Sequence, residues 1–290
     1  MMSRMGKGEG FVAALDQSGG SSPKALAGYG VTEDMYSGKA EMFGMIHGMR
    51  QRILHSPAFN SDSIVGAILF EMTMDGTDKD GKPFVETLAG KGIVPIVKVD
   101  EGLEDEADGV QLMKPLGKLD ALCERAVAKG VFGTKMRSVV KQANEDGVRA
   151  IVRQQMDEAL RILGHGLVPI LEPEVDINCP EREQAETILL DEALAQMERV
   201  PEGETVMWKL TIPVRENHYA QLMDHPQVLR VLALSGGYSR EEACERLAKQ
   251  DGMIASFSRA LLSGLDHSMS DDEFDATLAK SIDDISCASK

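Results

Sequence analysis

The chain is predicted to fold as an α/β protein, a (β/α)8 TIM barrel forming a single domain over residues 1–290. Two observations predict this fold. Eight short apolar runs follow one another, and segments of helical periodicity fill most of the gaps between them. Most runs also end in polar residues, and a barrel builds its active site at the carboxyl ends of its strands. A doubly wound open sheet is the alternative, but the SGG sequence at Ser18 lacks its glycine fingerprint.

The eight runs give the expected strands in chain order. They are GFVAALDQS (10–18), IVGAILFE (64–71), GIVPIVKVD (92–100), FGTKMRS (132–138), LVPILEPE (167–174), VMWKLT (206–211), VLRVLALSGG (228–237) and IASFSRAL (254–261). Side chains two residues apart on a strand share a face, so Lys98 projects with Asp100 and Glu172 with Glu174. Because such pairs recur near successive carboxyl ends, the sequence predicts one shared polar site.

Helical periodicity is clearest in three of the segments between or after these runs. The apolar positions are Met42, Ile46, Met49 and Ile53 in the first, Val148, Val152, Met156, Ala159 and Leu163 in the second, and Phe274, Leu278, Ile282 and Ile285 in the last. SREE at Ser239 and SDDE at Ser270 fit capping boxes, and Ser22 before Pro23 suggests a helix cap and first turn.

Composition limits the classes of partner. A formal charge of −16 disfavours nucleic acid and anionic membranes, whereas an anionic small molecule would suit positive charge gathered locally. The sequence shows neither a signal segment nor an apolar run of membrane-spanning length, so a soluble cytoplasmic protein is expected. Four scattered cysteines and six histidines without HxxH spacing suggest no disulfide framework and no metal site.

Lys209 lies in the middle of an apolar run, where an ammonium is costly to bury. An exposed edge strand would explain it simply. The alternative is a nucleophilic amine, because a desolvated lysine attacks carbonyl groups. Such chemistry needs an acid to remove water from the carbinolamine, for which Glu172 or Glu174 is suitable, and a base for carbon–carbon cleavage, for which Asp16 is placed. It requires no cofactor.

Two groups of residues suit phosphate. Ser235 and Gly236 follow the seventh run and Arg259 follows the eighth, where barrels frequently bind phosphate. A second cationic group follows earlier strands and comprises Lys98, Lys135 and Arg137, together with Ser18 and Ser21. Two such groups around a central lysine would suit a bisphosphorylated sugar. The second group could instead be an ion-pair network with the neighbouring carboxylates, and both descriptions can hold at once.

Taken together, GFVAALDQSGGSSPKAL, VKVDEG, FGTKMRS, LVPILEPE, WKLTIP, LSGGYS and SFSRAL resemble class I fructose-bisphosphate aldolase. The resemblance implies reversible cleavage of fructose 1,6-bisphosphate through a lysine Schiff base, without a metal. It makes Lys209 the Schiff-base lysine, Glu172 the dehydration acid and base, and Glu174 its neighbour. The remaining roles fall to Asp16 and Lys135 in carbon–carbon cleavage, Ser235, Gly236 and Arg259 at the C1 phosphate, and Ser18, Ser21, Lys98 and Arg137 near the other end.

The chain departs from the longer animal members of that family in two places. They use a carboxy-terminal tyrosine in proton exchange, but the last tyrosine here is Tyr238, and Phe257 stands where they carry a tyrosine. Other Schiff-base barrels, such as transaldolase and deoxyribose-phosphate aldolase, would need only one phosphate site. A metal-dependent aldolase and a noncatalytic binding scaffold are further alternatives. Self-association and the choice among sugar bisphosphates stay open.

Overall fold

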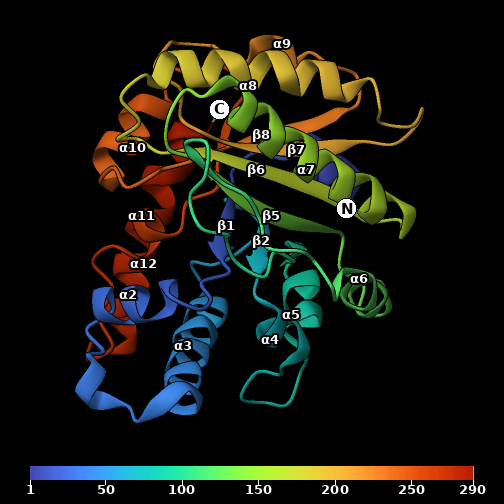
Figure 1. Ribbon diagram of the computed structural model, residues 1–290. Coiled ribbons are helices and arrows are strands. Elements are labelled where there is room, and N and C mark those ends of the chain that lie inside the picture. Colours follow the sequence, from blue (N-terminus) through green and yellow to red (C-terminus); the bar gives the residue numbers. More distant parts are fainter. Residues whose placement is uncertain (290) are drawn as a thin grey trace.

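The computed structural model describes residues 1–289, and its centre is a barrel of eight parallel strands (Figure 1). The strands, in their order around the barrel, are β1 (Phe11–Leu15), β2 (Ile64–Leu69), β3 (Val94–Lys98), β5 (Gly133–Val140), β6 (Val168–Val175), β7 (Val206–Thr211), β8 (Val228–Leu234) and β9 (Ile254–Ala255). The amide of Ala14 donates a hydrogen bond to the carbonyl of Phe257 at 3.2 Å, which joins the last strand to the first. The predicted barrel is confirmed, and the open sheet is wrong.

Helices cover the outside of the barrel (Figure 1). They are α1 (Met2–Lys7), α2 (Ser21–Gly28), α3 (Gly38–His55), α4 (Glu71–Asp75), α5 (Phe84–Gly90), α6 (Leu119–Ala128), α7 (Glu145–Gly164), α8 (Arg182–Met197), α9 (Ala220–Met223), α10 (Arg240–Leu247), α11 (Arg259–Leu262) and α12 (Asp271–Ala288), with a 3-10 turn at Glu33–Met35. The three periodic segments are confirmed as α3, α7 and α12.

The predicted helix caps are confirmed in part. Ser270 forms a complete capping box with Glu273, whereas Ser239 accepts a bond from the amide of Glu242 without the reciprocal bond. The expectation for Ser22 is wrong, because α2 begins at Ser21 and its N-cap is Gly20, two residues before Ser22. Among residues 1–289, no helix is long and apolar enough to cross a membrane.

The barrel interior changes from apolar to ionic along the strands. Its lower part is a buried cluster of Met5, Val12, Ala14, Val65, Ile68, Val94, Ile96, Phe132, Ile170, Met207, Leu232 and Ile254. Ile170 is followed two residues later by Glu172, and Met207 by Lys209, so the same inward face continues as the polar site. The apolar layer supports the site from below and leaves the carboxyl ends of the strands as its opening.

Two elements were not expected from the sequence. Helix α1 covers the amino-terminal end of the barrel, where Met5 is completely buried and Arg230 donates hydrogen bonds to the carbonyls of Met5 and Gly8. Strand β4 (Val110–Gln111) pairs antiparallel with the carboxyl end of β5. Neither element contributes a strand to the parallel barrel. Both are short additions that a search for repeated strand–helix units would miss.

Candidate active site

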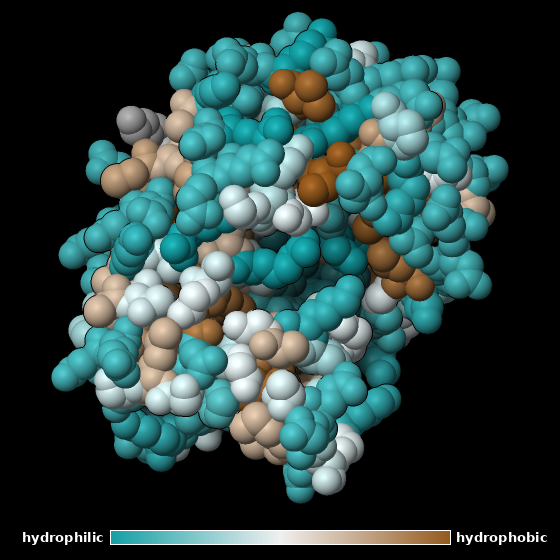
Figure 2. All heavy atoms as spheres, turned by 90° about the vertical axis from the view of Figure 1, so that its left-hand side faces the viewer, coloured by the Kyte–Doolittle hydropathy of each residue, from teal (hydrophilic) through white to brown (hydrophobic). Residues whose placement is uncertain are grey.

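A cavity of about 1170 Å³ opens at the carboxyl ends of the strands. Figure 2 shows this face as a hollow surrounded largely by hydrophilic residues. Every residue predicted for the site from the sequence lines the cavity, namely Asp16, Ser18, Ser21, Lys98, Lys135, Arg137, Glu172, Glu174, Lys209, Ser235, Gly236 and Arg259. Residues from seven strands or the segments directly after them therefore meet in one place. Their individual roles stay predictions.

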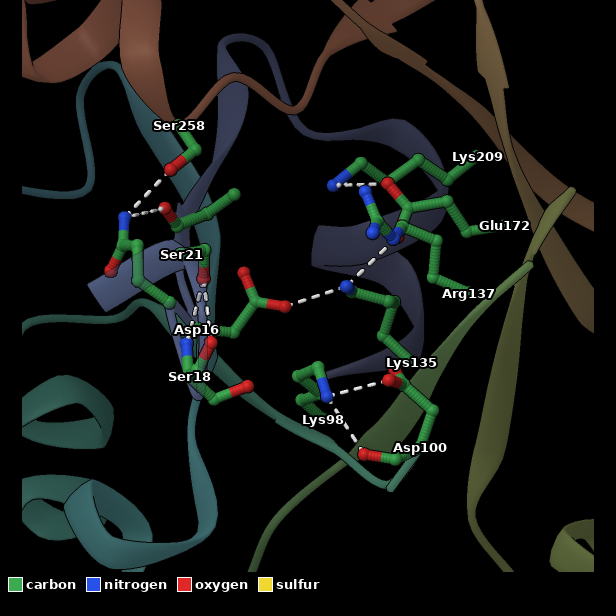
Figure 3. A network of polar contacts seen from close by, with 12 residues as sticks. Asp16, Ser18, Ser21, Lys98, Asp100, Lys135, Arg137, Glu172, Lys209 and Ser258 are labelled. Carbon is green, nitrogen blue, oxygen red and sulfur yellow. Dashed lines mark hydrogen bonds and ion pairs between the residues drawn. The ribbon is translucent and has the colours of Figure 1, made fainter. Parts of the chain in front are cut away.

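Lys135 and Glu172 form the centre of the site (Figure 3). The Lys135 Nζ lies 2.6 Å from Asp16 Oδ2 and 2.8 Å from Glu172 Oε2, and the Lys209 Nζ lies 2.9 Å from Glu172 Oε1. The four side chains come from β5, β6, β7 and the end of β1, and each is at most 10 % exposed. Lys209 is therefore buried and directed inward, and the edge-strand explanation is wrong.

The charges of this centre keep its two carboxylates ionised. Burial alone would raise the pKa of Asp16, but the charges of Lys135 and Lys209 outweigh burial and hold that pKa well below its usual range. Burial would likewise raise the pKa of Glu172, but the charges of Lys135 and Lys209 outweigh it and lower that pKa. Burial alone would lower the pKa of Lys135, but the negative charges of Asp16 and Glu172 outweigh burial and raise that pKa. Lys135 is thus a fixed positive charge between two fixed negative charges.

Glu174 behaves differently from Glu172, although the two side chains share a strand face. Burial raises the pKa of Glu174, and the charge of Arg137 opposes burial without overcoming it. The Arg137 Nη1 lies 2.8 Å from Glu174 Oε2, and this arginine is 41 % exposed, so it borders the opening. A carboxyl group with a raised pKa beside one with a lowered pKa is the arrangement expected for a proton donor and a proton acceptor.

Lys98 is also paired with a carboxylate. Its Nζ lies 2.6 Å from Asp100 Oδ1 and donates to the carbonyl of Asp100 at 2.7 Å. The ion-pair network considered from the sequence is therefore present around Lys98, Lys135 and Arg137. In contrast, none of the ion pairs among residues 1–289 involves Arg259, Lys24 or Lys118, three further cations that line the cavity. These cations are better available to an anionic ligand.

The loop after β8 leaves room for a ligand close to its backbone. Gly236 has φ +62°, and a Cβ there would lie 2.5 Å from Cγ2 of Ile177. Gly237 has φ +126°, and a Cβ there would lie 3.5 Å from Nη2 of Arg259. Both positions therefore favour glycine by conformation, and Gly236 also by lack of space for a side chain. The guanidinium group of Arg259 lies next to this loop, as a shared anion site requires.

We expect Gly236→Ala to raise the KM for a phosphorylated substrate about 10-fold or more, because the loop must shift away from Ile177. The effect on kcat should be smaller. Gly203→Ala is a matched control, since Gly203 also has a positive φ of +84° but open space around its Cβ position. Steady-state kinetics of both variants check this expectation. Equal KM values would contradict an anion site at this loop.

The loop after β1 is arranged by its own serines. Ser21 Oγ accepts from the amide of Ser18 at 2.9 Å and donates to its carbonyl at 2.8 Å. The structure also brings to the cavity residues that sequence reasoning missed, among them Gln17, Lys24, Lys118 and Ser258. Ser258 belongs to the same run as Arg259. Its place at the carboxyl end of a predicted strand was the signal that could have assigned it to the site. Phe257 is completely buried and does not line the cavity.

Metal ligation has little support in the described part of the chain. Residues 1–289 contain no group of three or more histidine, cysteine, aspartate or glutamate side chains arranged to hold a metal ion. The carboxylates of the cavity are instead paired with lysine and arginine side chains. The donor set of this site therefore suits acid–base chemistry next to an amine.

Comparison with known proteins assigns the chain to the aldolases. The family model "Fructose-bisphosphate aldolase class-I" matches residues 3–212. Proteins named fructose-bisphosphate aldolase class 1 from Porphyromonas gingivalis and Synechocystis are 56 % and 52 % identical, each covering 99 % of this chain and 98 % or 96 % of the relative. The chain belongs to the class I fructose-bisphosphate aldolase family. It is therefore a lyase, and the predicted resemblance is confirmed.

Solved structures agree with the fold at lower identity. The fructose-bisphosphate aldolase of Plasmodium falciparum, solved in complex with TRAP and a small-molecule inhibitor, has a TM-score of 0.80 and 19 % identity, covering 99 % of this chain and 92 % of that one. A protein of Corynebacterium glutamicum has a TM-score of 0.57 at 14 % identity, with 99 % and 91 % coverage. At these identities the likeness concerns the fold alone.

Proposed function

We propose that this chain reversibly cleaves fructose 1,6-bisphosphate to dihydroxyacetone phosphate and glyceraldehyde 3-phosphate, in glycolysis and gluconeogenesis, through a Schiff base on Lys209. The observation that carries the proposal is the buried amine of Lys209, 2.9 Å from Glu172 in a cavity that also holds the unpaired Arg259. A buried amine beside a carboxylate can attack a carbonyl and then expel water.

Glu172 is suited to move the proton in imine formation. The Lys209 ammonium first gives one proton to Glu172, and the neutral amine attacks the ketone C2. A second proton moves from the nitrogen to the C2 oxygen, and Glu172 then returns its proton to the carbinolamine hydroxyl, so that water leaves and the protonated imine forms. Loss of the charge on Lys209 removes one of the two cations that lower the pKa of Glu172. Glu172 thus becomes a better acid at the step that requires one. The raised pKa of Glu174, on the same strand face, supports a role for it as the proton partner of Glu172.

Asp16 and Lys135 serve the cleavage step. Asp16 accepts the proton of the C4 hydroxyl, the C3–C4 bond breaks, and its electron pair moves into the protonated imine to give an enamine. Protonation of the enamine at C3 and hydrolysis release dihydroxyacetone phosphate. The C1 phosphate binds at Ser235, Gly236 and Arg259, and Ser18, Ser21, Lys98 and Arg137 lie toward the other end. Lys24 and Lys118 add unpaired charge to the cavity wall.

The surroundings of the enzyme are part of the proposal. Cytoplasmic location is supported by four free cysteines, of which Cys123 and Cys179 are buried. A formal charge of −16 argues against nucleic acid as a partner. Self-association stays open, and exposed Met45 and Met72 offer apolar surface.

The proposal is tested by borohydride reduction in the presence of dihydroxyacetone phosphate, followed by peptide mapping. We expect one covalent adduct, on Lys209, and unchanged cleavage after treatment with EDTA. An adduct on another lysine would identify that lysine, and not Lys209, as the nucleophile. Loss of activity with EDTA would favour a metal-dependent reaction. A chain that binds sugar bisphosphate without forming an adduct would instead be a binding scaffold.

A further inference from the structure

Gln17 connects two parts of the active site that lie far apart in the sequence. Its side chain is 7 % exposed and lines the cavity between Asp16 and Ser18. The Gln17 Nε2 donates to Ser258 Oγ at 2.6 Å and to the carbonyl of Ala14 at 3.2 Å. Figure 3 shows the bond that reaches Ser258 from this side of the site. Ser258 directly precedes Arg259, so the amide joins the residue after Asp16 to the residue before Arg259.

Arg50 fixes the other side of Gln17. Its Nη2 donates to the main-chain carbonyl of Gln17 and, at 3.3 Å, to Gln17 Oε1, while its Nη1 donates to Thr73 Oγ1 at 2.8 Å. An arginine can only donate, so the amide oxygen must face Arg50 and the amide nitrogen must face Ser258. The orientation of the Gln17 side chain is thus determined, and every polar atom of its amide has a partner.

The position of Arg50 is unusual for a structural side chain. It is 1 % exposed on α3, and no carboxylate among residues 1–289 lies within 4 Å of it. Burial lowers the pKa of Arg50 to about 10, while the charge of Asp16 acts in the opposite direction. A buried cation without an ion-pair partner is destabilising. The hydrogen bonds of Arg50 to Gln17 and Thr73 connect this buried charge to the site.

We propose that Gln17 is a positioning residue that couples the Arg259 loop to the carboxylate of Asp16, with Arg50 as its anchor. The inference rests on the proposed roles of Arg259 and Asp16. Phosphate bound at Arg259 fixes the position of the loop that contains Ser258. The hydrogen bond from Gln17 to Ser258 then fixes the main chain at Gln17, next to Asp16. Cleavage of the C3–C4 bond, which needs Asp16, then depends on Gln17. Imine formation with dihydroxyacetone phosphate, which needs Lys209 and Glu172, does not.

The experiment compares these two reactions in Gln17→Leu and in Ser258→Ala. We expect the kcat for cleavage to fall about 10-fold or more in Gln17→Leu, because a small displacement of a reacting group has a large effect on rate. The rate of borohydride trapping with dihydroxyacetone phosphate should stay within about 2-fold of the wild type. Ser258→Ala should likewise slow cleavage and leave trapping nearly unchanged, without burying an apolar group beside Arg50. The double variant should be no slower than Gln17→Leu, since both changes break one link.

Gln250→Leu is the matched control. Gln250 is another buried glutamine, 5 % exposed, which accepts a hydrogen bond from the amide of Asn217 at 2.9 Å and does not line the cavity. Its loss should lower stability without changing the ratio of cleavage to trapping. Wild-type cleavage rates in both Gln17→Leu and Ser258→Ala, or a parallel loss of cleavage and trapping, would overturn the inference. A wild-type enzyme that traps no substrate on Lys209 would instead overturn the proposed function.

Discussion

Replacement of Lys209 by methionine is expected to reduce cleavage to background while the barrel still folds. Methionine fills a similar volume without an amine, so neither an imine nor its electron sink can form. The loss should be on the order of 10⁴-fold or more in kcat, as for other residues that form a covalent intermediate. Glu172 keeps its contact with Lys135 at 2.8 Å, so the substitution leaves no unpaired buried carboxylate.

A matched control for Lys209→Met is Lys91→Met. Lys91 is half-buried, burial lowers the pKa of its ammonium, and its Nζ donates to the carbonyls of Leu54, Ser56 and Phe59 outside the cavity. This variant should keep both turnover and the borohydride adduct, although it loses a lysine of lowered pKa. The comparison therefore tests whether adduct formation requires the position of Lys209 in the cavity or only the burial of a lysine. Persistent turnover in Lys209→Met would make Lys135 the leading candidate for the nucleophile.

The fold and the inward-facing charges could be predicted because both repeat along the chain. Alternation of side chains on a strand places Glu172 and Lys209 on the inward face whatever the neighbouring strands do. The pairing of charges depends on register between strands, which a single sequence does not give. Arg137 is level with Glu172 in the β5–β6 ladder, yet its ion pair is with Glu174. Lys98, in contrast, pairs with Asp100 of the same run, and that contact was within reach of the two-residue rule.

The support behind the site was missed for a different reason. Arg50 looks like a solvent-facing residue of an amphipathic helix, but it stands four residues after Ile46 and three before Ile53, on the buried face of α3. A charged residue inside an apolar stripe was the available signal. Its partners Gln17 and Thr73 follow two different strands, so only the folded barrel shows that the three side chains meet.

Lys135→Met is expected to damage both activity and stability, because Lys135 separates two buried carboxylates. Without it, Asp16 and Glu172 face one another, and among residues 1–289 only Lys209 still forms a direct ion pair with either carboxylate, with Glu172 at 2.9 Å. Breaking a buried ion pair by removing one partner destabilises a protein by about 3–5 kcal/mol. Like charges at short range also cannot both ionise, so the pKa of one carboxyl should rise strongly. Cleavage should fall at least 100-fold because the base is then partly protonated.

Lys135→Met is also expected to change how the stability of the protein depends on pH. In the wild type the pKa values of Asp16 and Glu172 are lowered by folding, so their contribution is present above the unfolded pKa values of about 4 and is lost as the pH falls through the folded values. In Lys135→Met folding instead raises the pKa of one of these carboxyl groups. The folded state then binds a proton more tightly than the unfolded state, so the free energy of unfolding should increase as the pH falls from 7.5 to 5. Urea unfolding at the two pH values measures this difference.

Lys141→Met is the control for the loss of a lysine–carboxylate pair. Its Nζ lies 2.6 Å from Asp176 Oδ2, as close as Lys135 lies to Asp16, but its side chain is 34 % exposed. A partly exposed pair contributes about 0–1 kcal/mol, so Lys141→Met should keep the pH dependence of the wild type. If Lys135→Met also kept that dependence, the two carboxylates would not be coupled through Lys135. A free energy of unfolding that increases toward low pH in Lys135→Met would therefore show that Lys135 keeps Asp16, the proposed base for cleavage, and Glu172 ionised together.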